Sequence, residues 1–259
     1  MRQIISVAVV IMIFAFSCKK TSTPTPVPVP KPDPNASLKD GLVAYYPFNG
    51  NLNDSSSNHF NGKSVGIIGF GADRTGVSNK ALQLNGDSSY VTVGDDVKLD
   101  LTNKMTITLE FYPETSDPYS LVAKRTVGDG AQSFHLMCNY QSPSVFSVIK
   151  GGKCSPANII SDWSNAFTDN TLSVRVNAWN CIVAIFDGAS QKVYLNGAKA
   201  ADLPIDFATM GGCAGTDIRF GYWWNFQPYS YKGRLDEIRI YNRVLTTDEI
   251  GKLCSSNNF

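Results

Sequence analysis

The segment GYWWNFQPYSYKG (221–233) concentrates aromatic side chains that could bind a flat ligand such as a sugar ring. Six aromatic residues fall within ten positions: Tyr222, Trp223, Trp224, Phe226, Tyr229 and Tyr231. Sugars present C–H faces that stack on aromatic rings, and an amide such as that of Asn225 would bind their hydroxyl groups. Adjacent Trp223 and Trp224 cannot both point inward if this segment is a strand, so at least one should be exposed.

The predicted ligand-binding residues therefore belong to one loop: Trp223, Trp224, Asn225 and Phe226. Trp163, in the polar stretch SDWSNAF (161–167), is a second candidate. The alternative is that such rings cap the core, as we expect for Tyr222 and Tyr231.

Acidic and amide side chains suggest a different chemistry, the binding of a cation. In GRLDEIRIY (233–241), a period of two places Asp236 on the same face as the inward-pointing Ile238 and Ile240. A buried carboxylate requires hydrogen-bond donors or a cation. The polar loop FNGNLNDSSSNHFNG (48–62) offers carboxylate, amide and backbone oxygens, the ligands that calcium prefers, although it lacks EF-hand spacing. Composition alone leaves open a calcium-binding loop and a hydrogen-bonded turn.

The residues that catalysis requires are not arranged in a recognisable pattern. Adjacent Asp236 and Glu237 should point to opposite faces of a strand, where they would not cooperate. Glu110 has no second carboxylate on its predicted strand (105–112). The sequence lacks G-x-S-x-G, C-x-x-C and H-E-x-x-H. We therefore expect no enzyme.

Cysteine usage is compatible with export to an oxidising compartment. Five cysteines follow Cys18. Cys138 and Cys154 flank a predicted hairpin and could form a disulfide, and a Cys181–Cys213 pair is a weaker candidate. An odd number leaves at least one thiol free or linked to another chain. Buried free cysteines are the alternative.

The elements that must position these residues are short strands. Alternating apolar residues recur at 41–48, 80–84, 90–93, 105–112, 132–140, 171–176, 180–186, 192–197, 217–223 and 233–241. One helix is predicted near the end, where Thr246 and Glu249 form a T-x-x-E capping box. Many strands without helical crossovers indicate an all-β antiparallel sandwich or barrel, which we expect to occupy residues 38–259 as one domain. A net charge of +1 without basic runs argues against nucleic-acid binding.

The first 37 residues indicate export and anchoring. Ile4 to Phe16 is too short an apolar run to cross a membrane, which needs about 20 residues, but it fits a signal peptide over 1–17. The following FAFSC resembles the lipobox of bacterial lipoproteins, which implies lipidation at Cys18. The proline-rich stretch that completes 18–37 predicts an extended tether. The expected location is the bacterial cell envelope, at the surface or the periplasmic face of the outer membrane.

Several segments together resemble the laminin-G-like, concanavalin-A-like family. They are GLVAYYPFNGNLNDSSSNHFNG, KALQLNGDSSYVTV, WNCIVAIFDGASQKVYLNG and YKGRLDEIRIYNRVLTTDEI, which frame the chain from about Gly41 to Ile250. The resemblance implies a two-sheet antiparallel jelly-roll β-sandwich with one short C-terminal helix. Its first and last strands would lie together.

The resemblance also implies a structural calcium ion (Ca2+) beside the first and last strands, because many relatives hold one there. The side-chain ligands carried over are Asp54 and Asp236, and backbone contributions would come from Asn51, His59 and Gly62. Trp179 matches the tryptophan of the family's W-x-x-V-A motif, which implies a core position. Relatives that cleave polysaccharides use an E-x-D-x-x-E arrangement, which this sequence lacks.

Two functions compete at this stage. The first is a lipid-anchored, non-catalytic module that binds carbohydrate, and the second is an adhesion module that recognises a cell-surface protein. A polysaccharide-cleaving enzyme of the same fold is a lesser alternative. An exposed aromatic platform flanked by polar groups would favour carbohydrate.

Overall fold

The computed structural model describes residues 35–87, 89–125, 132–138, 145–150, 163–167, 172–225 and 227–254. These residues belong to one compact unit, Asn35–Phe259. The predicted signal peptide, the lipidation site Cys18 and nearly all of the tether lie outside them, as do Cys154 and Phe226. The side chains of Trp163, Trp224 and Asn225 also lie outside the description. Within the described residues, no helix is long and apolar enough to span a membrane.

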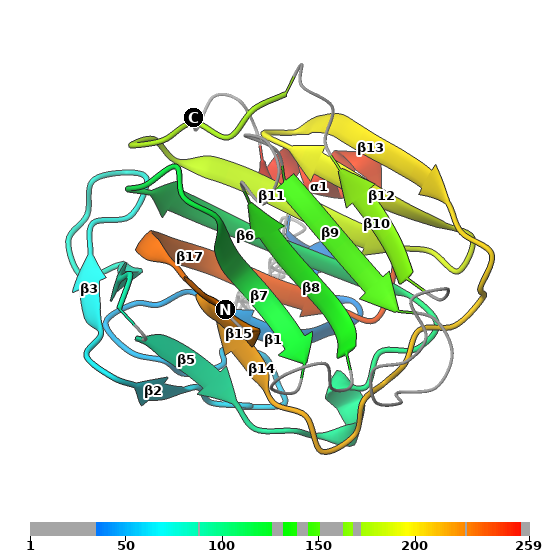
Figure 1. Ribbon diagram of the computed structural model, residues 1–259, viewed down its shortest axis with the longest axis horizontal. Coiled ribbons are helices and arrows are strands. Elements are labelled where there is room, and N and C mark those ends of the chain that lie inside the picture. Colours follow the sequence, from blue (N-terminus) through cyan, green and yellow to red (C-terminus); the bar gives the residue numbers. More distant parts are fainter. Residues whose placement is uncertain are drawn as a thin grey trace, which may run out of the picture. The chain divides into compact units, whose positions relative to one another are not determined.

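Antiparallel strands in the described residues form two large sheets that pack face to face (Figure 1). Sheet 1 has the order β13-β12-β11-β6-β17-β4-β3, with β1 also paired to β17. Its strands are β1 (Leu42–Tyr46), β3 (Gly69–Gly71), β4 (Ala81–Asn85), β6 (Met105–Pro113), β11 (Asn180–Phe186), β12 (Ser190–Leu195), β13 (Ala198–Pro204) and β17 (Lys232–Tyr241). The first and last long strands are therefore neighbours, as the resemblance implied.

Sheet 2 has the order β10-β9-β8-β7-β14-β5-β2. Its strands are β2 (Lys63–Val65), β5 (Tyr90–Val93), β7 (Tyr119–Arg125), β8 (Gln132–Cys138), β9 (Val145–Lys150), β10 (Trp163–Phe167) and β14 (Ile218–Phe220). A separate hairpin consists of β15 (Tyr222–Asn225) and β16 (Gln227–Ser230). The helical elements are η1 (Ala36–Lys39), η2 (Val97–Leu99) and α1 (Thr247–Leu253). This all-β sandwich with one short C-terminal α-helix is the predicted fold.

The main core lies between the two sheets and follows the period of two. Ile107, Leu109 and Phe111 of β6 point inward, and Phe134 and Leu136 of β8 meet them from the other layer. Burial of such side chains, each worth about 1.5–3 kcal/mol, supplies the main driving force for packing the sheets. The intervening side chains point to the outer faces, where binding is sterically possible.

Two local signals in the sequence are confirmed. Asn196 and Gly197 have positive φ angles of 52° and 83° and turn β12 into β13, as expected for an Asn-Gly hairpin. Thr246 caps α1, and the reciprocal bonds with Glu249 complete the predicted capping box.

A β-bulge in β17 overturns the predicted alternation of that strand. Glu237 has a φ of 53°, and the register with β6 shifts between Asp236 and Arg239. The extra residue places Leu235 in the core together with Ile238, so Asp236 points to the outer face of sheet 1 instead of inward. The bulge also brings Glu237 to this face, where the sequence pattern had separated the two acids.

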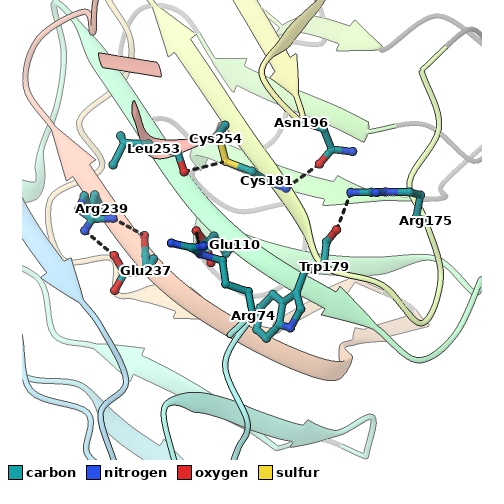
Figure 2. Close-up of a disulfide and its surroundings, with 10 residues drawn as sticks. All are labelled: Arg74, Glu110, Arg175, Trp179, Cys181, Asn196, Glu237, Arg239, Leu253 and Cys254. Atoms are coloured by element: carbon teal, nitrogen blue, oxygen red, sulfur yellow. Dashed lines mark hydrogen bonds and ion pairs between the residues drawn. A yellow bond between two sulfur atoms is a disulfide. The ribbon is translucent and has the colours of Figure 1, made fainter. Parts of the chain in front are cut away.

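The predicted disulfides are wrong. Cys138 is a free, buried thiol and therefore does not pair with Cys154. Cys181 bonds to Cys254 rather than to Cys213, and this disulfide links β11 to the end of α1 (Figure 2). Cys213 is also disulfide-bonded. The sequence pattern missed these partners because sheet pairing, not hairpin proximity, brings the last helix to β11.

The predicted strand over 171–176 is also wrong, because the described residues from 172 onward form bends and turns there. Conversely, β13 was missed, since its mostly exposed side chains lack apolar alternation. It forms by pairing with β12 across the Asn196-Gly197 turn.

A buried ion cluster anchors one end of sheet 2. The fully buried Lys124 ammonium lies 2.7 Å from an Asp95 oxygen and 2.8 Å from an Asp100 oxygen. Asp95 also accepts a hydrogen bond from the Gly215 backbone N–H at 2.6 Å. The cluster ties together the segments adjoining β5 and β14, and removing one member would leave a buried charge uncompensated.

Candidate functional site

The outer face of sheet 1 is partly covered, and a pocket opens on it beside Tyr45 and Arg239. Helix α1 lies behind this sheet (Figure 1) and packs Ile250 and Cys254 onto Val183 and Ile185 of β11. Further along the face, Arg74 reaches over β6, and its Nε lies 2.9 Å from an oxygen of Glu110 (Figure 2). Side chains of the chain itself therefore cover much of this surface.

A carboxyl pair lies beneath this cover. Asp236 and Glu110 are register partners on β17 and β6, and each is only 4% exposed. Burial raises the pKa of Asp236 to about 8, and the nearby Glu237 contributes. Burial also raises the pKa of Glu110 to about 7, against the opposing effect of Arg74. Paired carboxyl groups are the groups that glycosidases use, but their burial here leaves a substrate no access.

The second acid of the bulge, Glu237, has a structural environment of its own. It accepts a hydrogen bond from the Tyr45 hydroxyl at 2.8 Å and forms an ion pair with Arg239. The Arg239 guanidinium lies 4.0 Å from the centre of the Tyr45 ring. The Tyr45 side chain thus contacts both members of the Glu237–Arg239 ion pair.

Trp179 does not occupy the core position that the family motif implied. It is half-buried on the outer side of sheet 1, edge-on to Tyr112 at 5.8 Å between ring centres. Arg234 lies over both rings, 3.8 Å from the centre of Tyr112 and 5.4 Å from that of Trp179. The sequence matches the motif, yet the ring faces outward, and the side chain of the following Asn180 bonds the backbone of Arg175.

Asp54 organises the loop between β1 and β2 by accepting hydrogen bonds. One carboxylate oxygen accepts the backbone N–H groups of Tyr45 and Ser56, both at 2.8 Å. The other accepts the Ser56 hydroxyl and the Phe60 N–H, also at 2.8 Å. Four donors engage both oxygens of this carboxylate, as in a hydrogen-bonded turn.

Among the other residues of the predicted calcium site, His59 lies beside Asp54, with its Nδ1 atom 3.4 Å from the Asp54 carbonyl oxygen. Asn51 caps a local turn by accepting the Asn53 N–H. His59 has a φ of 56°, and Gly62 donates to the Leu52 carbonyl. Asp236 faces Glu110, whereas Asp54 bonds the backbone of Tyr45, which faces Arg239. No group of three His, Cys, Asp or Glu side chains that could hold a metal occurs in the described residues. The predicted calcium site also draws on backbone oxygens, and it stays a prediction.

The outer face of sheet 2 is built differently. Strand pairing places Lys63, Thr92, Arg219, Ala123 and His135 in one row across β2, β5, β14, β7 and β8. Their strand neighbours point into the core, so these side chains point away from it. The small Ala123 separates the two large polar groups. The row therefore presents the Arg219 guanidinium and the Thr92 hydroxyl, while His135 is buried at 2% exposure.

Aromatic rings flank this row. Tyr90 and Tyr222 stack with 4.6 Å between ring centres and 12° between planes. Arg219 lies 5.5 Å from the centre of the Tyr90 ring. Tyr222 reaches this position because the chain turns at Gly221, where φ is 83° and a Cβ atom would lie 2.1 Å from Leu84. Only glycine fits there, so this glycine sets the entry into the β15–β16 hairpin.

The hairpin supplies a second ring pair beside the row. Trp223 and Tyr229 face each other across β15 and β16 and stack at 5.2 Å. Trp223 also meets the His135 ring edge-on at 4.8 Å, and the His135 Nε2 lies 3.0 Å from the Ser120 hydroxyl oxygen. These six residues form a cluster, and we use the name aromatic groove for this cluster: Tyr90, His135, Arg219, Tyr222, Trp223 and Tyr229.

The sequence-predicted ligand residues agree with this groove only in part. Trp223 borders it, but at 8% exposure it supports the groove rather than forming an open platform. Tyr231 is fully buried, as expected, whereas Tyr222 stacks on Tyr90 instead of capping the core. Tyr90, Arg219 and His135 were missed, since no local pattern links three separate strands.

The groove contains groups suited to binding. Ring faces can stack on a sugar, and the guanidinium and hydroxyl groups can bond its oxygens. The six defining residues include no pair of carboxyl groups of the kind that glycosidases use.

Solved structures with the same architecture include a domain crystallised with an oligosaccharide. Domain 4 of AbnA, a GH43 extracellular arabinanase from Geobacillus stearothermophilus in complex with arabinotriose, is 22% identical with a TM-score of 0.61. The match covers 83% of this chain and 98% of that domain. Such a likeness establishes the fold.

Toxin domains are similar as well. The binding domain of botulinum neurotoxin DC in complex with SialylT is 12% identical over 85% of this chain and 52% of that one, with a TM-score of 0.62. The binding domain of Paraclostridial mosquitocidal protein 1 is 17% identical over 85% and 53%, with a TM-score of 0.64. The chain thus spans about half the length of these two binding domains.

No curated protein sequence matches the chain. A family model, Laminin_G_3, matches residues 85–251, which is more than half of the sequence. Together with the two-sheet fold, this match shows that the chain belongs to the concanavalin A-like lectin/glucanases superfamily.

Proposed function

We propose that this protein is a non-catalytic carbohydrate-binding module whose ligand lies in the aromatic groove of sheet 2. The observation that carries the proposal is the stacked Tyr90–Tyr222 pair next to Arg219. Both tyrosines are half-buried, so each retains exposed ring surface. A sugar ring that stacks on this surface places its hydroxyl groups within reach of polar side chains in the same row.

The similar structures support this choice of ligand class. Two of them were solved with oligosaccharide ligands, the arabinanase domain with arabinotriose and the neurotoxin domain with SialylT. The contrast between the two outer faces supports it too. The carboxyl pair on sheet 1 lies under Arg74, whereas the groove on sheet 2 holds polar and aromatic groups without a carboxyl pair.

The test is a glycan array with the purified full-length protein and variants in each aromatic cluster. Tyr222→Ala removes one of the stacked rings and should abolish binding, since stacking contributes most of the contact area. Tyr112→Ala is the matched control, because it removes a half-buried tyrosine from the outer face of sheet 1.

Circular dichroism would establish that both variants fold. Binding that survives Tyr222→Ala but is lost in Tyr112→Ala would place the ligand on sheet 1 and refute the groove. Failure of the wild-type protein to bind any glycan would refute the carbohydrate function and favour the protein-recognition alternative.

We further propose that lipidation at Cys18 anchors the module in the bacterial cell envelope. The supporting observation is the apolar run that ends at FAFSC, followed by proline-rich residues. An anchored binding module would hold its glycan ligand close to the membrane surface.

A further inference from the structure

The charge distribution in the aromatic groove indicates what kind of carbohydrate it would take. This inference rests on the proposed function. Lys63 and Arg219 lie in the same row of sheet 2, with the uncharged Thr92 between them. The row is therefore basic in a chain whose net charge is only +1.

Arg219 differs from the other arginines whose side chains the structure describes. Arg74, Arg239 and Arg243 form ion pairs with glutamates. Two more donate to backbone carbonyls: Arg175 to Trp179 and Arg234 to Ala72. Each of these arginines therefore has a hydrogen-bond acceptor or an acidic partner within the fold.

Arg219 has neither kind of acceptor within the described residues. Its contact there is with the face of Tyr90, and its Nε is buried and makes no hydrogen bond in that part of the chain. The nearest acid along the strand, Asp217, accepts a hydrogen bond from the Thr92 hydroxyl at 3.0 Å. A partly buried guanidinium without an acceptor is costly, and an external anion would remove that cost.

We propose that the ligand is an acidic glycan whose sugar carries a carboxylate, as a hexuronic acid does. The planar guanidinium of Arg219 matches a carboxylate with two parallel hydrogen bonds. Tyr90 holds the guanidinium from its ring face, and Tyr222, stacked on Tyr90, takes the face of the sugar. In this proposal, Arg219 binds the carboxylate of the sugar and Tyr222 binds the face of its ring.

The experiment compares three oligosaccharides of equal length by calorimetry on the full-length protein: a hexuronate, the corresponding neutral hexose and a sulfated hexose. The wild type should bind the hexuronate about 10- to 100-fold more tightly than the neutral sugar, as one charge-assisted contact allows. Arg219→Gln should remove this preference, because it weakens binding of the hexuronate more than binding of the neutral sugar. Arg219→Lys should retain only part of the preference, because a lysine lacks the planar fork.

Arg175→Gln is the matched control, since it removes an exposed arginine that is not among the six residues of the groove. Equal wild-type affinity for hexuronate and neutral sugar would overturn the acidic-ligand proposal and leave the carbohydrate function standing. Tighter binding of the sulfated sugar would overturn the carboxylate assignment. Binding of none of the three at a site sensitive to Tyr222→Ala would overturn both proposals. The wild-type comparison decides these outcomes even if an Arg219 variant fails to fold.

Discussion

The Asp236–Glu110 pair is the most unusual feature at the scale of single residues. Like charges directly opposite each other on neighbouring strands repel, and burial removes the water that would screen them. The pair persists because both groups hold a proton more tightly than usual, with pKa values of about 8 and about 7. In the unfolded chain, these groups titrate near pH 4.

This difference predicts that stability decreases as the pH rises from about 4 to 8, because the folded state retains protons that the unfolded state has lost. Asp236→Asn keeps an oxygen that can accept the Glu237 N–H but cannot ionise. It should therefore raise the melting temperature at pH 8, by about 2–4 °C for each kcal/mol gained, and change it little at pH 4. Thermal unfolding at the two pH values measures this.

Asp87→Asn neutralises an exposed acid and serves as the control. A lower melting temperature for Asp236→Asn at pH 8 would contradict the prediction. It would mean that the Asp236 carboxylate is ionised and stabilised by a positive partner.

At the scale of elements, the β1–β2 loop is ordered by Asp54. Its four hydrogen bonds join the loop to β1, and an alanine would leave the N–H groups of Tyr45, Ser56 and Phe60 without this acceptor. Each buried, unsatisfied donor costs about 1–3 kcal/mol. Asp54→Ala should thus lower the melting temperature by several degrees, equally in calcium and in EDTA.

Differential scanning fluorimetry in both conditions tests this role. Asp73→Ala is a suitable control, because Asp73 caps an exposed turn with similar bonds to Thr75 and Val77. If calcium raises the melting temperature of the wild type and Asp54→Ala abolishes this rise, the result would support the calcium site that the family resemblance implied.

Elements also show how much the sequence could reveal. The Asn196-Gly197 turn and the Thr246–Glu249 capping box were predictable, because each depends on residues within four positions of one another. The bulge at Glu237 was not, since nothing in GRLDEIRIY marks a non-glycine residue with positive φ. The bulge at Glu237 turns Asp236 to the outer face of sheet 1. The predicted inward position of Asp236 was therefore wrong.

The candidate site could also be predicted from the sequence only in part. Tyr90, Arg219 and His135 lie on β5, β14 and β8, and pairing within sheet 2 brings them together. Their sequence separations carry no periodic signal. The sequence identified the segment around Trp223 because its aromatic residues lie close together. In the structure, however, the Trp223 ring is buried and supports the groove instead of forming an open platform.

At the scale of the whole molecule, the two sheets have separate tasks. Sheet 1 is partly covered by α1, the Cys181–Cys254 disulfide and Arg74, and these contacts stabilise the fold. On sheet 2, Tyr90, Tyr222 and Arg219 remain partly exposed, whereas His135 and Trp223 are buried. A module anchored at one end and binding through one sheet face can present that face to an extended polymer.

Anchoring itself can be tested on the full chain expressed in a bacterium. Cys18→Ala should move the protein from the membrane fraction to the soluble fraction, because lipid chains at this thiol would be lost along with the membrane affinity that they provide. Labelled palmitate should enter the wild type and not the variant. Cys138→Ala is the control, since that thiol is buried and free within the fold. Membrane association that persists without Cys18 would contradict the lipoprotein assignment and point to the uncleaved apolar segment, 4–16, as the anchor.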